Sequence, residues 1–302
     1  MASELQNRRR SRFRAGLTRA WRSLRTFWDF YLFAGGFFLV FAMFGVAALV
    51  FPELPGEAIV GSGPLMNAQG PDASHWFGTN RDRLDLLGPV FAAAGRSLWL
   101  AALATLFGAL AGMVASTALF FGGGEPGVRL AKRIGGFATG APALVLLVIL
   151  AAGHGAGAGA TFWMLAALVG LFLVGRSAEW YRGYGERNEV VAARALGFSK
   201  WRILVGQCLP QVGPRLAASA ATLLPGVLLA EAALGFVGAG EAEGRATGRL
   251  GAVLAAGREA MFDLPWMLLY PGLVLAGLVI VLGALAWALR RTLDEPIDDR
   301  LF

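Results

Sequence analysis

Long apolar segments, separated by polar segments that contain arginine, are the dominant pattern of this chain. A helix needs about 20 predominantly apolar residues to cross the hydrocarbon core of a bilayer. Six segments have this character, and the fourth is the shortest. They cover residues 30–51, 89–121, 134–152, 160–174, 216–236 and 266–289. The pattern therefore predicts an all-α integral membrane protein with six transmembrane helices.

The distribution of Lys and Arg predicts how these helices are oriented, because cytoplasmic loops of membrane proteins are enriched in positive charge. With the N-terminus inside, the outer side receives only a small part of the 27 Lys and Arg residues. These outer residues are Arg81, Arg83, Arg96, Arg245, Arg249 and Arg258. The opposite orientation would place most of the positive charge outside. We therefore predict that both termini lie in the cytoplasm and that the protein resides in the bacterial inner (cytoplasmic) membrane.

The pattern of residues 1–29 predicts a basic amphipathic arm on the cytoplasmic side. Its apolar positions at helical spacing are Phe13, Leu17, Trp21, Leu24 and Trp28. A helix of this kind lies in the headgroup region and is attracted by anionic lipids. Membrane lipids are therefore a predicted partner. An arm that only sets the topology, or that packs on the bundle, is an alternative.

The rest of the chain divides at the polar segments. The predicted parts are the first transmembrane helix at 30–51, a periplasmic loop at 52–88, a core domain at 89–290 and a cytoplasmic tail at 291–302. Inside the core lie a cytoplasmic loop at 178–212 and an outer loop at 238–265, with a candidate short helix at 250–261. The sequence GGGEPG at 122–127 predicts a tight cytoplasmic turn.

The composition agrees with a membrane protein and excludes several kinds of chemistry. Hydrophobic residues make up 56% and charged residues 16% of the chain, whereas soluble domains are about 25% charged. The net charge of +7 is explained by the cytoplasmic loops, so nucleic acid is not an expected partner. A phosphate-binding loop motif is lacking, so we expect no ATP hydrolysis by this chain alone. His75 and His154 lie in separate loops, and Cys208 is the single cysteine. We therefore predict no catalytic residues, no metal site and no bound cofactor.

The cytoplasmic segment 186–210 carries the most specific local pattern. Asn188 is predicted to cap a short helix, and Glu189 suits the first turn because of the helix dipole. Small residues would let this helix enter a groove closely: Ala192, Ala193 and Ala195. Gly197 is expected to end the helix, and Phe198 then projects as an apolar knob. This helix is too polar to span the membrane.

A second helix follows, which Ser199 is able to cap and Pro210 is expected to end or kink. The whole segment resembles the E-A-A-x-x-x-G-x(9)-I-x-L-P loop of permeases from binding-protein-dependent ATP-binding-cassette (ABC) importers. The matching residues are Ala192, Ala193, Gly197, Leu209 and Pro210. Val191 stands at the position of the family's glutamate, and Gln207 at that of its isoleucine.

Further motifs resemble the C-type permease subunit of dipeptide, oligopeptide and nickel importers. They are HWFGTN at 75–80 with Asp85, LAEAALGFVGAG at 229–240, AGRE at 256–259, PW at 265–266 and LDEP at 293–296. Arg83-Leu84 replaces the Gly-Arg of the first of these motifs. Each motif is weak by itself, but together they occur in the family's order over about residues 21–301.

This resemblance implies a cytoplasmic coupling helix that transmits ATPase closure to the membrane. The implied ATPase-coupling residues are Arg187, Glu189, Val191, Ala192, Ala193, Arg194, Leu196, Gly197, Phe198, Leu209 and Pro210. Implied partners are a homologous permease in a heterodimer, two ABC ATPase subunits that hold ATP and Mg²⁺, and an extracytoplasmic substrate-binding protein. The residues expected in loops that face the binding protein are His75, Gly78, Thr79, Asp85, Arg258 and Glu259.

Glu231 is the one acidic residue inside a predicted span. A charge in this environment is costly and faces protein or water, so Glu231 serves either helix packing or a substrate path. Peptides are the expected substrate, with nickel chelates or other small solutes as alternatives. A secondary carrier and a membrane scaffold without transport are the rival classes. One ionisable residue in the spans argues against a carrier.

Overall fold

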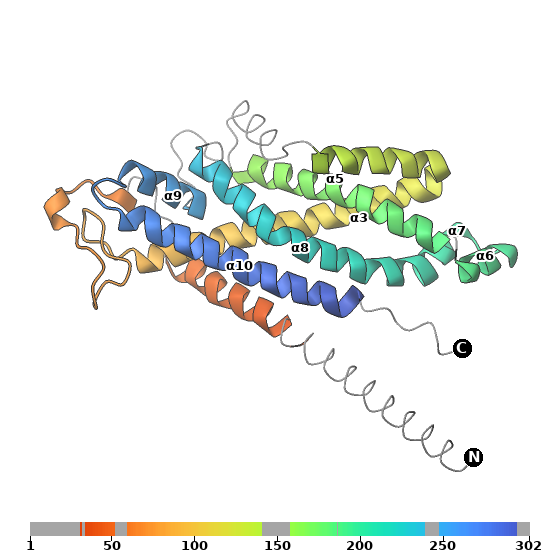
Figure 1. Ribbon diagram of the computed structural model, residues 1–302, viewed down its shortest axis with the longest axis horizontal. Helices are drawn as coiled ribbons and strands as arrows, with labels where there is room; N and C mark the ends of the chain where they lie inside the picture. Colours follow the sequence, from red (N-terminus) through yellow and green to blue (C-terminus); the bar gives the residue numbers. More distant parts are fainter. Residues whose placement is uncertain are drawn as a thin grey trace, which may run out of the picture.

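The computed structural model describes residues 31, 34–51, 59–140, 158–185, 187–238 and 248–294. The regular elements within this part of the chain are helices (Figure 1). They are an unlabelled first helix Ala34–Val50, η1 Leu65–Asn67, α3 Leu87–Gly140, α5 Ala158–Gly185, α6 Asn188–Ala195, α7 Lys200–Ile203, η2 Leu204–Cys208, α8 Leu209–Phe236, α9 Leu250–Glu259 and α10 Trp266–Asp294. The predicted all-α class is thus confirmed. The arm at 1–29, His154 and the end of the tail lie outside the described residues.

Four helical stretches are long and apolar enough to cross a membrane. They are Leu87–Gly136, Gly159–Gly183, Trp201–Phe236 and Trp266–Arg290, and the apolar helix Ala34–Val50 is shorter. The arrangement with six spans stays a prediction, since the third predicted span continues beyond Gly140, where the described stretch ends. The predicted fourth span, 160–174, lies within the longer helix α5. α5 continues to Gly185 because Ala178 and Tyr181 pack in its last turns, so packing rather than hydropathy sets its end.

α3 consists of two helical arms that meet at a bend. Gly124 has φ 53° and ψ −138°, which is not helical and which residues with a Cβ rarely adopt. The two arms approach each other closely beside this bend. A Cβ on Gly127 would lie only 1.9 Å from the carbonyl oxygen of Leu119. The turn predicted at 122–127 is therefore confirmed. The second arm then packs on α5, where Gly135 and Gly175 face each other without side chains.

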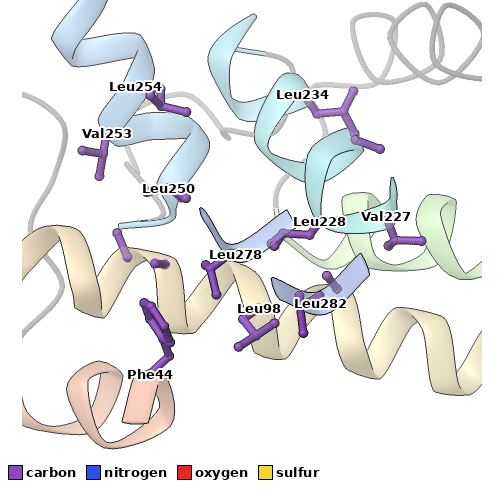
Figure 2. Packing of buried hydrophobic residues seen from close by; sticks show 14 of the residues in the cluster. Phe44, Leu98, Val227, Leu228, Leu234, Leu250, Val253, Leu254, Leu278 and Leu282 are labelled. Atoms are coloured by element: carbon purple, nitrogen blue, oxygen red, sulfur yellow. The ribbon is translucent and has the colours of Figure 1, made fainter. Parts of the chain in front are cut away.

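The first helix, α3, α8 and α10 extend along the long axis of the molecule (Figure 1). α9 and the loop at 59–86 lie at one end, whereas α6 and α7 lie at the other. Buried side chains from the first helix, α3, α8, α9 and α10 meet in one hydrophobic core (Figure 2). Examples are Phe44, Leu98, Leu228, Leu250 and Leu282. This core holds the two ends apart on a common scaffold.

α9 confirms the short helix predicted at 250–261, and it packs between α8 and α10. Most of its residues are buried. Gly251 lies against Gly235 of α8 so closely that a Cβ on either would meet the other's backbone at 2.8 Å. Arg96 of α3 adds polar links, since its guanidinium donates to the carbonyl oxygens of Phe51 at 2.6 Å and Gly248 at 3.2 Å. A cation near the carbonyl oxygens that end a helix is favourable.

Candidate functional site

α6 is anchored to the bundle through one face. Val190 and Ala193 are buried in a cluster with Tyr181 of α5 and residues from the following helices. The other members of the cluster are Ile203, Leu204, Cys208 and Val212. The predicted N-cap was wrong by one residue. Arg187 is the N-cap, with extended backbone and no side-chain cap, and Asn188 is the first helical residue. Asn188 is not needed as a cap because Arg187 supplies the carbonyl oxygen that accepts from Val190 and Val191.

The C-terminus of α6 ends as the sequence predicts. Gly197 has φ 78° and donates its N–H to the carbonyl oxygen of Arg194 at 3.0 Å, while Phe198 donates to that of Ala193 at 3.1 Å. This pair of bonds is the Schellman motif, in which the left-handed residue is usually glycine. The motif turns the chain sharply and places Phe198 directly beside the end of the helix.

The other face of α6 is open to solvent. Val191 is 52% exposed, Leu196 75% and Phe198 40%. The guanidinium carbon of Arg202 lies 4.8 Å from the centroid of the Phe198 ring, a cation–π distance. Glu189, Ala192 and Arg194 are also exposed. The chain therefore presents a mixed apolar and charged surface on a helix whose opposite face is buried through Val190 and Ala193.

α7, η2 and α8 form one continuous helical stretch behind α6. Ser199 Oγ accepts from the N–H of Arg202 at 3.3 Å, which confirms the predicted cap. The prediction that Pro210 ends or kinks this helix was wrong as to ending it, since α8 continues through Pro210 to Phe236. The π-helical turn Leu204–Cys208 precedes Pro210. Its wider hydrogen-bonding pattern is a usual way to insert an irregularity into a helix, frequently at functional sites.

The stretch that follows α6 is longer than a membrane span needs to be. Trp201–Phe236 has 36 residues, and a helix rises about 1.5 Å per residue. Its length of about 54 Å exceeds the hydrocarbon core of about 30 Å. Leu209 borders an apolar cavity of about 670 Å³ between this stretch and α3, which Phe121 and Trp201 also line. Within the described part of the chain, no hydrogen-bond partner reaches the buried Oε1 atom of Gln207.

At the opposite end of the molecule, the loop at 59–86 is a hydrogen-bonded structure. Thr79 and Asp85 form an isolated β-bridge, and Thr79 Oγ1 accepts from the N–H of Gln69 at 2.9 Å. Asp85 accepts from the N–H of Leu87 at 2.8 Å and so caps the start of α3. Thr79 is 1% exposed and Gly78 is also buried. These residues therefore make the internal hydrogen bonds and packing of the loop and are not part of its exposed surface.

His75 lies at the surface of this loop, beside Asp72. The hydroxyl of Ser74 and the backbone N–H of His75 both donate to Asp72 Oδ1, at 2.7 and 2.6 Å. These hydrogen bonds, that from Ser74 first, lower the pKa of the Asp72 carboxyl from its ordinary value. Among the described residues, no group of three His, Cys, Asp or Glu side chains is placed to hold a metal ion.

The loop at 59–86 contacts the start of α10, which the separate motifs did not reveal. Trp266 Nε1 donates to the carbonyl oxygen of Thr79 at 3.2 Å, and Phe77 stacks on Tyr270 at 4.7 Å between centroids. Arg258 lies over the Phe236 ring at 5.1 Å, and Glu259 is exposed at the end of α9. The motifs at 75–85 and 265–266 therefore form one surface at this end of the molecule.

Glu231 pairs with Arg249 inside the chain. The distance from Glu231 Oε1 to Arg249 Nη1 is 3.0 Å, and the side chains are 1% and 5% exposed. Ser97 Oγ accepts from the N–H of Leu250 at 2.9 Å beside this pair. Sequence reasoning missed Arg249 because it assigned this residue to a solvent-exposed loop. An arginine directly before an apolar helix was the available signal.

The helices and surfaces described above define a multi-pass membrane protein with an exposed helix at one end and a structured loop surface at the other. No sequence-family profile matches the chain. It is 30% identical over 204 residues, 67% of each chain, to "Probable D,D-dipeptide transport system permease protein DdpC" of Escherichia coli K12. It is 28% identical over 245 residues to "Oligopeptide transport system permease protein OppC" of Mycobacterium tuberculosis H37Rv, covering 75% of this chain and 77% of the relative. "Dipeptide transport system permease protein DppC" of Alkalihalophilus pseudofirmus is 25% identical over 264 residues, 86% and 84% of the two chains.

The chain belongs to the family of permease subunits of binding-protein-dependent ABC transport systems. It is a multi-pass protein of the bacterial cytoplasmic membrane. As the transmembrane subunit of such a system, it has no ATPase site of its own.

Proposed function

We propose that this chain forms a translocation path together with a homologous partner permease, and that α6 couples the path to two cytoplasmic ATPase subunits. The single observation that carries this proposal is the two-sided environment of α6. Val190 and Ala193 fix the helix to the bundle, whereas Val191, Leu196 and Phe198 face outward. A helix held in this way transmits a push on its outer face to α5 and α8.

We propose peptides as the substrate, because the relatives are named as oligopeptide and dipeptide transport permeases. Nickel chelates or another small solute are the alternative. The outer loops that join through Trp266 and Thr79 would receive an extracytoplasmic binding protein. In this arrangement six helices span the membrane and both termini lie in the cytoplasm, which the surplus of Lys and Arg in the predicted inner segments supports.

The proposal is tested by purifying the chain from its native membrane in a mild detergent. Mass spectrometry should find a second permease and one or two ATPases, and the eluate should hydrolyse ATP with vanadate sensitivity. Reconstituted vesicles, supplied with the binding protein, should accumulate labelled peptides rather than nickel chelates. Recovery of the chain alone from several detergents would favour a secondary carrier or a scaffold instead.

The Phe198→Asp substitution tests the coupling role directly. A carboxylate at this position would enter an apolar groove only at a high free-energy cost, because its charge would be buried without a partner. We expect the complex to assemble but substrate-stimulated ATP hydrolysis to fall at least tenfold, measured in proteoliposomes. Phe198→Leu is the matched control, because it keeps an apolar side chain at the same position. Unchanged stimulation in the Phe198→Asp variant would contradict the role.

A further inference from the structure

The outward face of α6 is a continuous stripe with little polarity. Asn188, Val191, Ala192 and Ala195 follow the i, i+3, i+4, i+7 spacing that aligns side chains on one side of a helix. All four are exposed, and Val191 has the largest apolar side chain of the four. Leu196 and Phe198 extend this apolar surface past the end of the helix. Three of the four stripe positions are thus apolar, although they face solvent.

Positive charges surround this apolar stripe. Arg187, Arg194 and Arg202 are exposed around α6, and Glu189 is the one acidic residue of the helix. The surface therefore has an apolar centre and a predominantly basic edge. A protein partner that covers it has complementary chemistry when its own centre is apolar and its edge is acidic.

Position 191 bears on which partner surface fits, because a valine stands where the family motif has glutamate. A glutamate at the centre of an interface requires a donor or a cation on the partner, since an unpaired buried charge is costly. Val191 offers no acceptor, so a basic side chain opposite it would itself be buried without a counterion. The absence of the carboxylate therefore changes which partner surface fits.

We propose that Val191 determines which ATPase this chain accepts: its cognate ATPase carries an apolar rather than a basic residue opposite Val191, with acidic residues around it. This inference rests on the proposed function, because it assigns the outer face of α6 to the ATPase. It follows that this chain pairs poorly with ATPases that serve permeases with the glutamate.

The test compares Val191→Glu with Val191→Leu in the complete complex, co-expressed with its own partner permease and ATPases. We expect Val191→Glu to reduce the affinity for the ATPase at least tenfold and Val191→Leu to change it less than threefold. Affinity is measured by titrating the purified permease pair, in nanodiscs, with labelled ATPase. Equal affinity of the Glu variant and the unchanged chain would overturn the inference. If the unchanged chain binds no ATPase, the proposed function fails instead.

A photo-crosslinking residue at position 191 gives a second, independent readout. In the assembled complex it should attach to the ATPase, and mass spectrometry of the joined peptide identifies the residues opposite. An apolar contact flanked by Asp or Glu is the expected result. A Lys or Arg directly opposite position 191 would overturn the inference. Attachment to lipid or to the partner permease, while ATPase remains bound in the same sample, would overturn it as well.

The basic edge predicts that ATPase binding depends on the salt concentration. Replacing Arg187 and Arg194 together with Gln should weaken ATPase binding at low ionic strength and flatten its dependence on salt, because exposed charge pairs are screened. The Val191→Glu loss should persist at high salt if the glutamate is buried against apolar groups. A Val191→Glu loss that disappears in high salt would contradict an apolar contact at this position.

Discussion

Arg83 is a residue whose backbone conflicts with its side chain. It has φ 62°, and of the described residues it is the only one other than glycine with positive φ. The family motif at 75–85 has glycine at this position. A left-handed conformation costs a residue with a Cβ about 1–2 kcal/mol, whereas glycine adopts it freely but loses more chain entropy on folding. The arginine is therefore a local cost in an otherwise well-bonded loop.

We expect Arg83→Gly to stabilise the protein by about 0.5–1 kcal/mol, the balance of these two effects. Thermal unfolding of the purified protein in detergent measures it. Leu84→Gly is the matched control, since Leu84 is adjacent and exposed but has no positive φ. The control should lower stability, because glycine there brings only its entropy loss. A lower unfolding temperature for both variants would show that Arg83 makes contacts that outweigh its strain.

At the scale of elements, the pair Glu231–Arg249 joins α8 to the start of α9. Removing one partner of a buried pair leaves the other charge without compensation, at a cost of about 3–5 kcal/mol. Replacing both by apolar residues of similar volume is often neutral. We therefore expect Glu231→Leu to destabilise the protein strongly and Glu231→Leu with Arg249→Met to recover most of the loss.

Detergent-stability assays on the single and double variants complete this comparison, with Glu259→Gln as an exposed control. The double variant should approach the stability of the unchanged chain. Additive losses in the double variant would mean that the two side chains do not act as a pair. If Glu231 instead serves the substrate path, the double variant would be stable but would not transport.

Much of each element could be predicted from the sequence. Hydropathy located the apolar helices, Gly197 located the end of α6, and GGGEPG located the bend of α3, because each depends on local chain chemistry. The end of α5 and the continuation through Pro210 depend on packing and on a π-helical turn, which leave no periodic signal. The contacts Trp266–Thr79 and Glu231–Arg249 join residues far apart in sequence. The motifs therefore identified the segments that take part, but they did not predict which residues contact each other.

At the scale of the whole molecule, the described helices place two different surfaces at opposite ends (Figure 1). The loop at 59–86 carries Met66, which is 95% exposed, and the end of α6 carries Leu196, which is 75% exposed. Cys208 is the single cysteine of the chain and is buried. Cysteines introduced at positions 66 and 196 therefore report the side of the membrane on which each end lies, with the unchanged chain as the background control.

We expect a membrane-impermeant maleimide to label Met66→Cys in cells with a permeabilised outer membrane and an intact cytoplasmic membrane. Leu196→Cys should be labelled only after the cytoplasmic membrane is opened and bound ATPase is stripped with urea, because the proposed interface covers this position. The physical reason is that the segments around α6 hold many of the arginines, which are retained on the cytoplasmic side. Labelling of Leu196→Cys in intact cells would invert the topology and would separate α6 from cytoplasmic ATPases. Labelling of both positions from the same side would instead mean that an even number of spans separates them.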